Sequence, residues 1–487
     1  MNLESLIKYI DVVDKLNYKD VDIKGISYNS NTINSHEIFV CLKGEHVDGH
    51  DFAQKAFEKG AVALMCEKPL NIEIPQIIVK STQESIADLA AAFYHHPSNE
   101  LNLIGVTGTN GKTTVAHLVQ KIFEQDNKKC ALIGTLGYKL SSKDDYLEAK
   151  HTTPQAPQMQ ATLQKILKND ILNVITEVSS HALEQFRVKN CNFSTAVFTN
   201  LTQDHLDYHI TMENYFNAKA KLFKSLKEGN SAVINADDKY AKRLEEVVAD
   251  RVDILTYGVK NKADLMAKNI EFMPDGVKFD CCYKDECVEF KLHLNGMFSV
   301  YNSLASIGVG LVNGIKLQTI KEALEVTRSV AGRFEIVSTS PMVIVDYAHT
   351  PDGLENILRA ARELTPKDGN LICMFGCGGN RDCTKRPKMG KIAQQMSDKI
   401  IITSDNPRQE DPQQIITDIL SGLNLINPKT VFVEPDRRLA IKLLKDISSE
   451  NDVLVLAGKG HENYQILKDK TIHFDDREEA LKVFKGE

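Results

Sequence analysis

The sequence lacks several features that would each indicate a particular class of protein. Among its 487 residues, no run of apolar side chains is long enough to cross a bilayer as a helix. The first residues, MNLESLIKYIDVVDKL, lack the basic segment followed by an apolar core that marks a secretion signal. We therefore expect a cytoplasmic protein with no membrane partner.

An excess of positive charge is also missing. The formal net charge at pH 7 is -7, and acidic and basic residues are mixed along the chain. Such a chain offers no basic stripe to the phosphates of a nucleic acid. This argues against nucleic acid as a main partner.

The ten cysteines are scattered rather than grouped in a recognisable framework. The tightest groups are Cys281-Cys282-Cys287 and Cys373-Cys377-Cys383, and neither matches paired zinc spacing or a small disulfide scaffold. We expect all ten to be reduced thiols. A metal site at the second group stays open, although cysteines in ordinary strands and loops need no metal.

The sequence does contain enough apolar material, at 42%, for about three globular domains. Residues 1–98 form a small mixed unit. Residues 99–330 alternate short apolar runs with amphipathic stretches, which predicts a parallel sheet with helices on its faces and an antiparallel appendage between about 262 and 294. Residues 331–487 repeat the alternation, which predicts a doubly wound, Rossmann-like domain. The expected fold class is therefore α/β.

Polar clusters follow the predicted strands of the third unit, in the segments DYAHTPDG, GCGGNRD, SDNPRQEDP and AGKGHENYQ. Ligands of open parallel sheets bind at the carboxyl ends of the strands. The alternative is that these segments are simple turns, but turns rarely gather Asp, Arg, His and Glu at one edge. The pattern favours a binding site.

A phosphate-binding loop is predicted in LNLIGVTGTNGKTTVAHLVQKIF, where a strand, a glycine-containing turn and a helix follow one another. The strict motif requires a glycine where Val106 stands, so the loop is a shortened version, Gly108-Thr109-Asn110-Gly111-Lys112-Thr113. Backbone N–H groups at the helix start can still face a phosphate, Lys112 can reach its oxygens, and Thr113 can hold Mg²⁺. Nucleotide binding is the favoured interpretation.

Glu177 and His205 also follow predicted strands of this central sheet, so both can face the nucleotide. Taken singly, each is more often an ordinary polar residue than a metal ligand. An imidazole suits Mg²⁺ less well than oxygen does, which indicates that an anionic ligand is still to be found.

The ordered segments TGTNGKTT, EVSSHAL, TNLTQDHLDYH followed by NAK, GRFE, DYAHTP, GCGGNRD, DNPR and AGKGHE resemble the motif set of the Mur ligases, over residues 105–462. The resemblance is strongest to the members that add diaminopimelate to a UDP-muramoyl dipeptide. It implies an N-terminal domain for the UDP moiety, a central ATPase and a C-terminal amino-acid-binding domain. It also implies ATP as a substrate, Mg²⁺ at two sites and action as a monomer.

The resemblance further implies roles for individual residues. The residues expected at ATP are Gly108, Thr109, Asn110, Gly111, Lys112, Thr113, Thr114, Asn302, Arg333, Asp346 and His349. Those expected at the UDP-muramoyl dipeptide are Ser30, Thr152, Thr153, Ser179, Gln185, Arg187 and Lys219, with Asn29-Ser30-Asn31 standing where the family often has DSR. Those expected at diaminopimelate are Arg381, Asp405, Asn406, Arg408, Gly458 and Glu462.

The missing anionic ligand is expected to be Lys219. By the resemblance, Thr113 and Glu177 hold one metal ion, while Glu177, His205 and a carbamylated Lys219 serve the second, and these residues with Lys112 form the catalytic group. A neutral lysine amine can take up CO₂ to become an anionic carbamate if its surroundings lower its pKa. The alternative is that Lys219, like its neighbour Lys221, lies on a solvated helix face.

Two alternatives to a diaminopimelate-adding ligase stay open from the sequence. A lysine-adding or other Mur ligase, or a folylpolyglutamate ligase, would share the ATPase motifs, although the additional N-terminal unit favours a UDP-muramoyl substrate over a folate. A regulatory protein that uses the nucleotide as a switch would need the phosphate loop without the amino-acid site.

Overall fold

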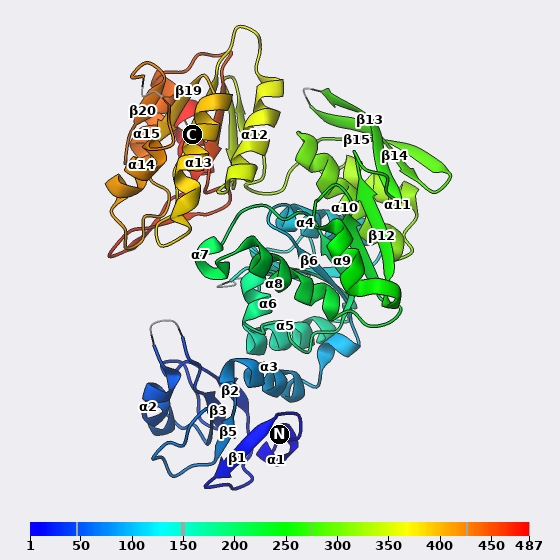
Figure 1. Ribbon diagram of the computed structural model, residues 1–487, viewed down its shortest axis with the longest axis vertical. Helices are drawn as coiled ribbons and strands as arrows, with labels where there is room; N and C mark the ends of the chain where they lie inside the picture. The colour runs from blue at the N-terminus through cyan, green and yellow to red at the C-terminus, as the bar shows by residue number, and fades with distance from the viewer. Residues whose placement is uncertain (45–46, 148–150, 274, 425–426, 487) are drawn as a thin grey trace.

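The computed structural model describes residues 1–44, 47–147, 151–273, 275–424 and 427–486, which form three α/β units, each built on its own sheet. Figure 1 shows the N-terminal unit (blue) at the bottom, the central unit (cyan to green) in the middle and the C-terminal unit (yellow to red) above it. The expected three-domain α/β architecture is confirmed. The exact divisions at residues 98 and 330 stay predictions.

The N-terminal unit has a five-stranded sheet in the order β1-β5-β4-β3-β2, in which only the pair β1 and β5 is antiparallel. Its strands are β1 (Val12–Leu16), β2 (Gly25–Ser27), β3 (Glu37–Val40), β4 (Ala63–Cys66) and β5 (Gln76–Val79). Its helices are α1 (Leu3–Ile7), α2 (Ala53–Glu58) and α3 (Thr82–Phe93). Helix α3 begins after Ser81, whose side chain accepts a hydrogen bond from the Glu84 N–H, as expected for an N-cap. It packs against helix α5 of the central unit.

The central unit has a ten-stranded sheet in the order β15-β14-β13-β12-β11-β10-β6-β9-β7-β8. Its strands are β6 (Asn102–Thr107), β7 (Cys130–Gly134), β8 (Gly137–Lys139), β9 (Asn173–Glu177), β10 (Phe193–Phe198), β11 (Ser231–Asn235), β12 (Asp253–Gly258), β13 (Leu265–Met273), β14 (Gly276–Tyr283) and β15 (Glu286–Leu292). Its helices are α4 (Lys112–Gln125), α5 (Ala156–Lys168), α6 (Ser180–Glu184), α7 (Leu206–His209), α8 (Met212–Lys224), α9 (Ala241–Val248), α10 (Met297–Val312) and α11 (Leu317–Glu325).

Helices cover both faces of this sheet. One core joins apolar residues of the sheet with those of α4, α10 and α11, and a second core joins the other face with α5, α6, α8 and α9. The pairs of β14 with β13 and with β15 are antiparallel, so the predicted antiparallel appendage is confirmed.

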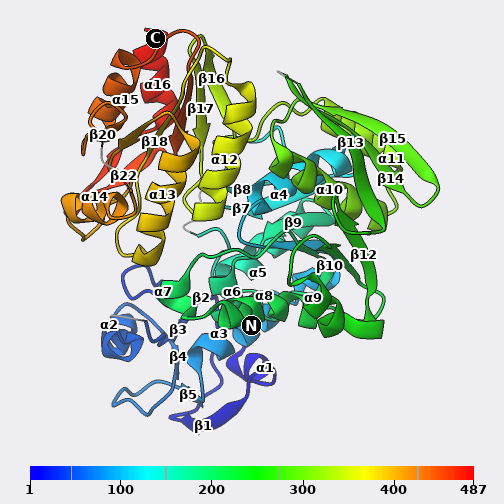
Figure 2. The ribbon, with the colours of Figure 1, turned by 45° about the horizontal axis from the view of Figure 1, so that its top comes forward.

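The C-terminal unit has a six-stranded sheet in the order β16-β17-β21-β18-β19-β20, parallel except for the edge strand β16. Its strands are β16 (Glu335–Thr339), β17 (Met342–Asp346), β18 (Leu371–Phe375), β19 (Lys399–Ile402), β20 (Val431–Val433) and β21 (Val453–Ala457), with a separate hairpin of β22 (Tyr464–Ile466) and β23 (Thr471–His473). Its helices are α12 (Pro351–Leu364), α13 (Arg386–Met396), α14 (Pro412–Leu420), α15 (Arg437–Asp446) and α16 (Asp476–Phe484). Helices α12 to α14 pack on one face, and α15 and α16 on the other (Figure 2), which is the predicted doubly wound arrangement.

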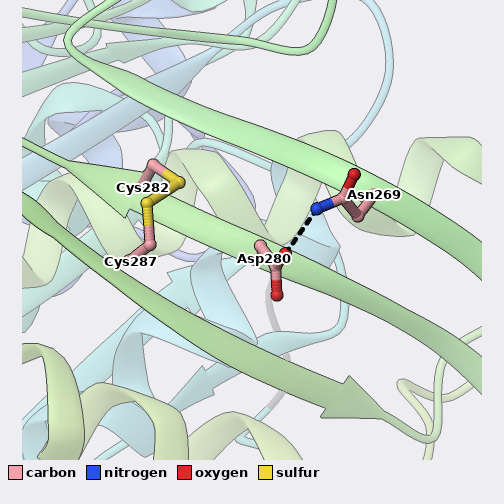
Figure 3. The surroundings of a disulfide bond; sticks show 4 residues. All are labelled: Asn269, Asp280, Cys282 and Cys287. Atoms are coloured by element: carbon pink, nitrogen blue, oxygen red, sulfur yellow. Dashed lines mark hydrogen bonds between the residues drawn. A yellow bond between two sulfur atoms is a disulfide. The ribbon is translucent and has the colours of Figure 1, made fainter.

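The prediction that every cysteine is a free thiol is wrong for one pair. Cys282 on β14 and Cys287 on β15 are directly paired across the hairpin, with Cα atoms 4.1 Å apart, and form a disulfide (Figure 3). The reason is the hairpin register, because the tight turn after Tyr283 brings residues five apart in sequence face to face. Sequence spacing alone does not reveal that register.

The other cysteines of the described residues are free. Within the same residues, no group of three or more histidine, cysteine or acidic side chains is arranged to hold a metal ion, which gives no support to a site at Cys373-Cys377-Cys383. No helix in the described part of the chain is both long and apolar enough to cross a membrane.

Candidate active site

The phosphate loop joins the end of β6 to the start of α4, as its sequence predicts. Gly108 and Gly111 have φ angles of +149° and +89°, a region that favours glycine. Neighbouring side chains also require glycine here, since a Cβ on Gly108 would lie 1.9 Å from Thr199 Oγ1 and one on Gly111 would lie 2.3 Å from Asn302 Oδ1. The N–H groups of Thr109 and Asn110 donate to Asn200, so the N–H groups at the start of α4 are the ones that face a phosphate.

Two lysine amines meet beside this loop. Lys112 Nζ donates hydrogen bonds to the carbonyl oxygens of Gly108 (2.9 Å) and Thr109 (2.8 Å), and Lys219 Nζ donates to the same Gly108 oxygen (2.8 Å). Lys219 is 2% exposed, so the alternative of a solvated helix face is wrong. Burial, followed by the charge of Lys112, holds the pKa of Lys219 well below its ordinary value.

Glu177, at the end of β9, is fully buried and lies beside the loop. Its carboxylate accepts hydrogen bonds from the Thr113 hydroxyl (2.9 Å) and from the backbone N–H and hydroxyl of Thr135 (2.9 Å each). Arg333 Nη2 also donates to the Thr113 hydroxyl (3.0 Å). A hydroxyl and a carboxylate beside each other are oxygen donors of the kind that Mg²⁺ takes in nucleotide sites, so these residues fit such an ion.

His205 takes part in a charged cluster that joins the central and C-terminal units. Asp204 is buried, and its carboxylate lies 3.2 Å from His205 Nε2, 3.5 Å from Lys385 Nζ and 3.6 Å from His349 Nε2. Burial opposes ionisation of Asp204, but the His205 and Lys385 side chains and a hydrogen bond with His349 outweigh it and hold the pKa of Asp204 well below its ordinary value. Burial lowers the pKa of His205 to about 3, so its imidazole is neutral and able to act as a ligand.

A cavity of about 300 Å³, which suits a small ligand, lies beside the phosphate loop. The predicted nucleotide residues on its wall are Asn110, Gly111, Thr114, Asn302, Arg333 and Asp346. Thr109, Lys112 and Thr113 of the loop line a second cavity together with Thr152, Glu177, Ser179, His205, Lys219 and His349, whereas Gly108 lines neither cavity. The predicted ATP residues are thus brought together around one loop, with His349 on the side of Glu177 and Lys219.

The residues predicted at the UDP-muramoyl dipeptide lie in two separate places. Ser30 and Gln185 line a third cavity between the N-terminal and central units, whereas Thr152 and Ser179 lie near Glu177. Arg187 connects the groups, because it donates to Gln185 Oε1 (2.6 Å from Nη2) and to the Thr153 carbonyl (3.0 Å).

Thr153 differs from its neighbours. Its buried hydroxyl donates to the Glu177 carbonyl (2.8 Å) and accepts from the Ser179 N–H (3.0 Å). These backbone bonds position the segment after β9, and Thr153 lines none of the three cavities among the described residues.

The residues predicted at the amino acid gather at the carboxyl end of the C-terminal sheet. Asn406 Nδ2 donates to Glu462 Oε2 (2.8 Å), which joins the loop after β19 to the loop after β21. Arg408 Nη1 donates to the Gly379 carbonyl (2.9 Å) in the loop after β18. A Cβ built on Gly378 would lie 2.8 Å from Arg408 Nη1 and 3.7 Å from Arg381 Cγ, so both arginine side chains lie beside the loop after β18. Burial, followed by the charge of Arg381, lowers the pKa of Arg408.

Comparison with known proteins agrees with this arrangement. Residues 22–98 match the Mur ligase family catalytic domain, residues 106–310 the Mur ligase middle domain and residues 332–460 the Mur ligase glutamate ligase domain. The chain is 44% identical to the UDP-N-acetylmuramoyl-L-alanyl-D-glutamate--2,6-diaminopimelate ligase of Clostridium botulinum, with 100% of each chain covered. It belongs to the Mur ligase family.

Solved structures of Mur ligases share this fold. A structure of a UDP-N-acetylmuramoyl-L-alanyl-D-glutamate--2,6-diaminopimelate ligase is similar at a TM-score of 0.66, with 32% identity and 95% of each chain covered. MurF ligase from Thermotoga maritima in complex with ADP gives a TM-score of 0.66 at 19% identity, covering 96% of this chain and 99% of that one, and this likeness concerns the fold alone.

Some residues of this Mur ligase site were not predicted from the sequence. Asp204 and Lys385 build the charged cluster, and in the nucleotide cavity Asp352 accepts from Asn110 Nδ2 (2.7 Å) while Tyr301 donates to Asp237 (2.8 Å). A signal was present for some of them. Asp204 precedes His205 within one motif, and Asp237 follows the predicted strand SAVIN.

Proposed function

We propose that this Mur ligase joins an amine of meso-diaminopimelate to the D-glutamate carboxylate of UDP-N-acetylmuramoyl-L-alanyl-D-glutamate, using ATP, in the synthesis of a peptidoglycan precursor. The observation that carries the proposal is the setting of Arg408. Among the described residues no carboxylate pairs with its guanidinium, because Glu410, a possible surface partner, pairs with Arg386 instead (2.8 Å). Arg408 and Arg381 thus stay available for the carboxylate that distinguishes diaminopimelate from lysine.

A carboxylate must be activated before an amine can attack it. The glutamate oxygen attacks the γ-phosphorus of ATP, and the bond from that phosphorus to the β–γ bridging oxygen breaks. The products of this step are ADP and an acyl phosphate on the glutamate. Two unit charges about 4 Å apart repel by roughly 4 kcal/mol at an effective dielectric constant near 20. Lys112 and Arg333, which lie beside the phosphate loop, would offset this repulsion.

The amine then attacks the acyl carbon, a tetrahedral intermediate forms, and phosphate leaves as the amine loses its proton. Water would hydrolyse the acyl phosphate, so the site must exclude it. The contacts of Asp204 with His349 and Lys385 support a closed arrangement, in which the C-terminal unit covers the phosphate loop.

Two Mg²⁺ ions belong to this proposal, and when bound they would neutralise charge on the phosphates. Thr113 and Glu177 would hold the first. Glu177, His205 and a carbamylated Lys219 would hold the second, and the buried amine of Lys219, with its lowered pKa, is suited to take up CO₂. A cytoplasmic location and action as a monomer stay predictions.

The test is phosphate release from ATP with the substrates supplied singly and together. A ligase of this kind releases phosphate only when the UDP-linked dipeptide and diaminopimelate are both present, and the product gains the mass of one diaminopimelate. Release that prefers lysine would assign a lysine-adding ligase, and hydrolysis that needs neither substrate would indicate a nucleotide switch.

A further inference from the structure

Lys459 lies in the segment AGKGHE, next to the proposed amino-acid ligand Gly458, and has no role in the reaction described so far. Its side chain is fully buried. Its Nζ lies 3.1 Å from Glu462 Oε2, 3.4 Å from Asn406 Oδ1 and 3.6 Å from Asp405 Oδ1. All three partners belong to the proposed amino-acid site, and they come from two separate loops.

The Lys459 ammonium contacts two carboxylates, those of Asp405 and Glu462, which would otherwise repel each other. Asp405 is 7% exposed, and its Oδ1 has no hydrogen-bond partner among the described residues. Burial, followed by the charge of Asp405, raises the pKa of Glu462, and Lys459 opposes that rise. Without the ammonium, two neighbouring buried carboxyl groups tend to share a proton.

The geometry of Glu462 leaves one oxygen for a ligand. Oε2 accepts from both Lys459 and Asn406, whereas Oε1 has a single distant contact among the described residues, with the Tyr464 hydroxyl at 3.5 Å. A substrate ammonium at Oε1 would therefore meet a carboxylate whose position is already fixed by the two loops.

We propose, resting on the function proposed above, that Lys459 is a positioning residue for the amino-acid substrate. Its ammonium joins the loops after β19 and β21 and keeps Glu462 available as a carboxylate for the distal ammonium of diaminopimelate, while Arg408 and Arg381 take the distal carboxylate. One internal cation and two carboxylates leave this half of the site with a net negative charge, which complements an ammonium.

Other groups around Glu462 do not replace Lys459. They are Tyr347, Arg408, Arg437 and Tyr464. Arg437 is committed to Asp476 through two hydrogen bonds (2.8 and 2.7 Å), and the Arg408 guanidinium donates to Gly379. Lys459 is the cation in hydrogen-bond contact with the Glu462 carboxylate among the described residues.

The test compares diaminopimelate with 2-aminopimelate, the same diacid without the distal amine, in wild type and Lys459→Met. The wild type should prefer diaminopimelate, and the variant should lose at least about tenfold of that preference in kcat/KM. The KM values for ATP and for the UDP-linked dipeptide should stay within about twofold. Raising the pH should restore part of the variant's affinity for diaminopimelate, because burial and Asp405 already raise the pKa of Glu462 and the loss of Lys459 would raise it further.

Lys399→Met is the matched control, since this lysine lies in the same unit at the opposite end of β19 and donates to the Ile447 carbonyl (2.8 Å). It should leave the preference unchanged. If Lys459→Met weakened both amino acids equally, or tightened diaminopimelate, the positioning role would be wrong. A wild-type enzyme that does not use diaminopimelate would instead overturn the proposed function.

Discussion

Burial of a lysine amine decides what that amine can do. Lys219 and Lys112 share the Gly108 carbonyl oxygen, and two cations so close in a buried place favour the neutral amine on one of them. Because the pKa of Lys219 is held well below its ordinary value, a larger fraction of its amine is neutral at any given pH than for an exposed lysine, and that fraction falls as the pH is lowered. A neutral amine is the form that reacts with CO₂.

We predict that Lys219→Ala lowers kcat by about 10²- to 10³-fold, the usual effect of removing one group that stabilises charge in the transition state. Short carboxylates should restore part of the activity by replacing the carbamate. Isotopically labelled bicarbonate should give a carbamate NMR signal in the wild type that is missing in the variant. Lys221→Ala, whose half-exposed side chain pairs with Glu184, is the control and should behave as wild type.

We predict that Arg408→Ala raises the KM for diaminopimelate by about 30-fold, equivalent to about 2 kcal/mol for a lost charge-assisted hydrogen bond. The KM values for ATP and the UDP-linked dipeptide should change little, because Arg408 lies on the C-terminal loops. Arg438→Ala, which removes a pair with Glu479 on the same unit, is the control. A loss of affinity that is equal for all three substrates would contradict selective recognition.

The element that places the reacting groups is the turn between β6 and α4. Parallel strands end at one edge of the sheet, and the register pairs Val106 of β6 with Glu177 of β9 and with Val197 of β10. The phosphate loop, the Glu177 carboxylate and the segment that carries His205 therefore meet at that edge.

We predict that Gly111→Ala raises the KM for ATP by more than about tenfold. A left-handed backbone costs a residue other than glycine about 1–2 kcal/mol, and the new Cβ would also displace Asn302 from the nucleotide cavity. Gly229→Ala is a matched control, since its φ is +77° and a Cβ there meets nothing within 4 Å. The Gly229→Ala variant should lose stability in thermal unfolding and keep its KM for ATP. If Gly229→Ala raised the KM for ATP as much as Gly111→Ala, backbone strain rather than the loss of the nucleotide site would explain both.

The whole molecule depends on contacts between its units. Asp204 meets Lys385 and His349 across the interface, and Asn110 in the phosphate loop meets Asp352 of α12. Such contacts place the amino-acid loops against the ATP site, so they bear on turnover more than on the folding of either unit.

We predict that Lys385→Met lowers kcat about tenfold, because the buried Asp204 loses a cation that holds the units together. Trypsin should then cut faster at the exposed Arg328, between α11 and β16. Lys367→Met, an exposed site on the same unit, serves as the control. Unchanged turnover and unchanged cleavage would mean that this contact does not hold the units in their working arrangement.

Much of the fold is encoded in local sequence patterns. Apolar runs such as LNLIGVT and DVLVLAG became buried parallel strands, because a strand covered on both faces needs a continuous apolar run. Gly108 and Gly111 were recognisable since a phosphate loop needs a strand before it and a helix after it. The chain alone thus determined three α/β units, the edge of each sheet that carries polar groups and the family to which the motifs belong.

Only the tertiary structure decided which groups meet. The burial of Lys219, the pairing of Asp204 with Lys385 and the contact of Lys459 with Glu462 each join residues whose closeness or burial no local pattern encodes. The disulfide of Cys282 with Cys287 depended on hairpin register, which a shift of one residue would abolish. The reason is common to all four: pKa values, ion pairs and cross-strand pairs depend on distance and on exclusion of water, which exist only after the chain has packed.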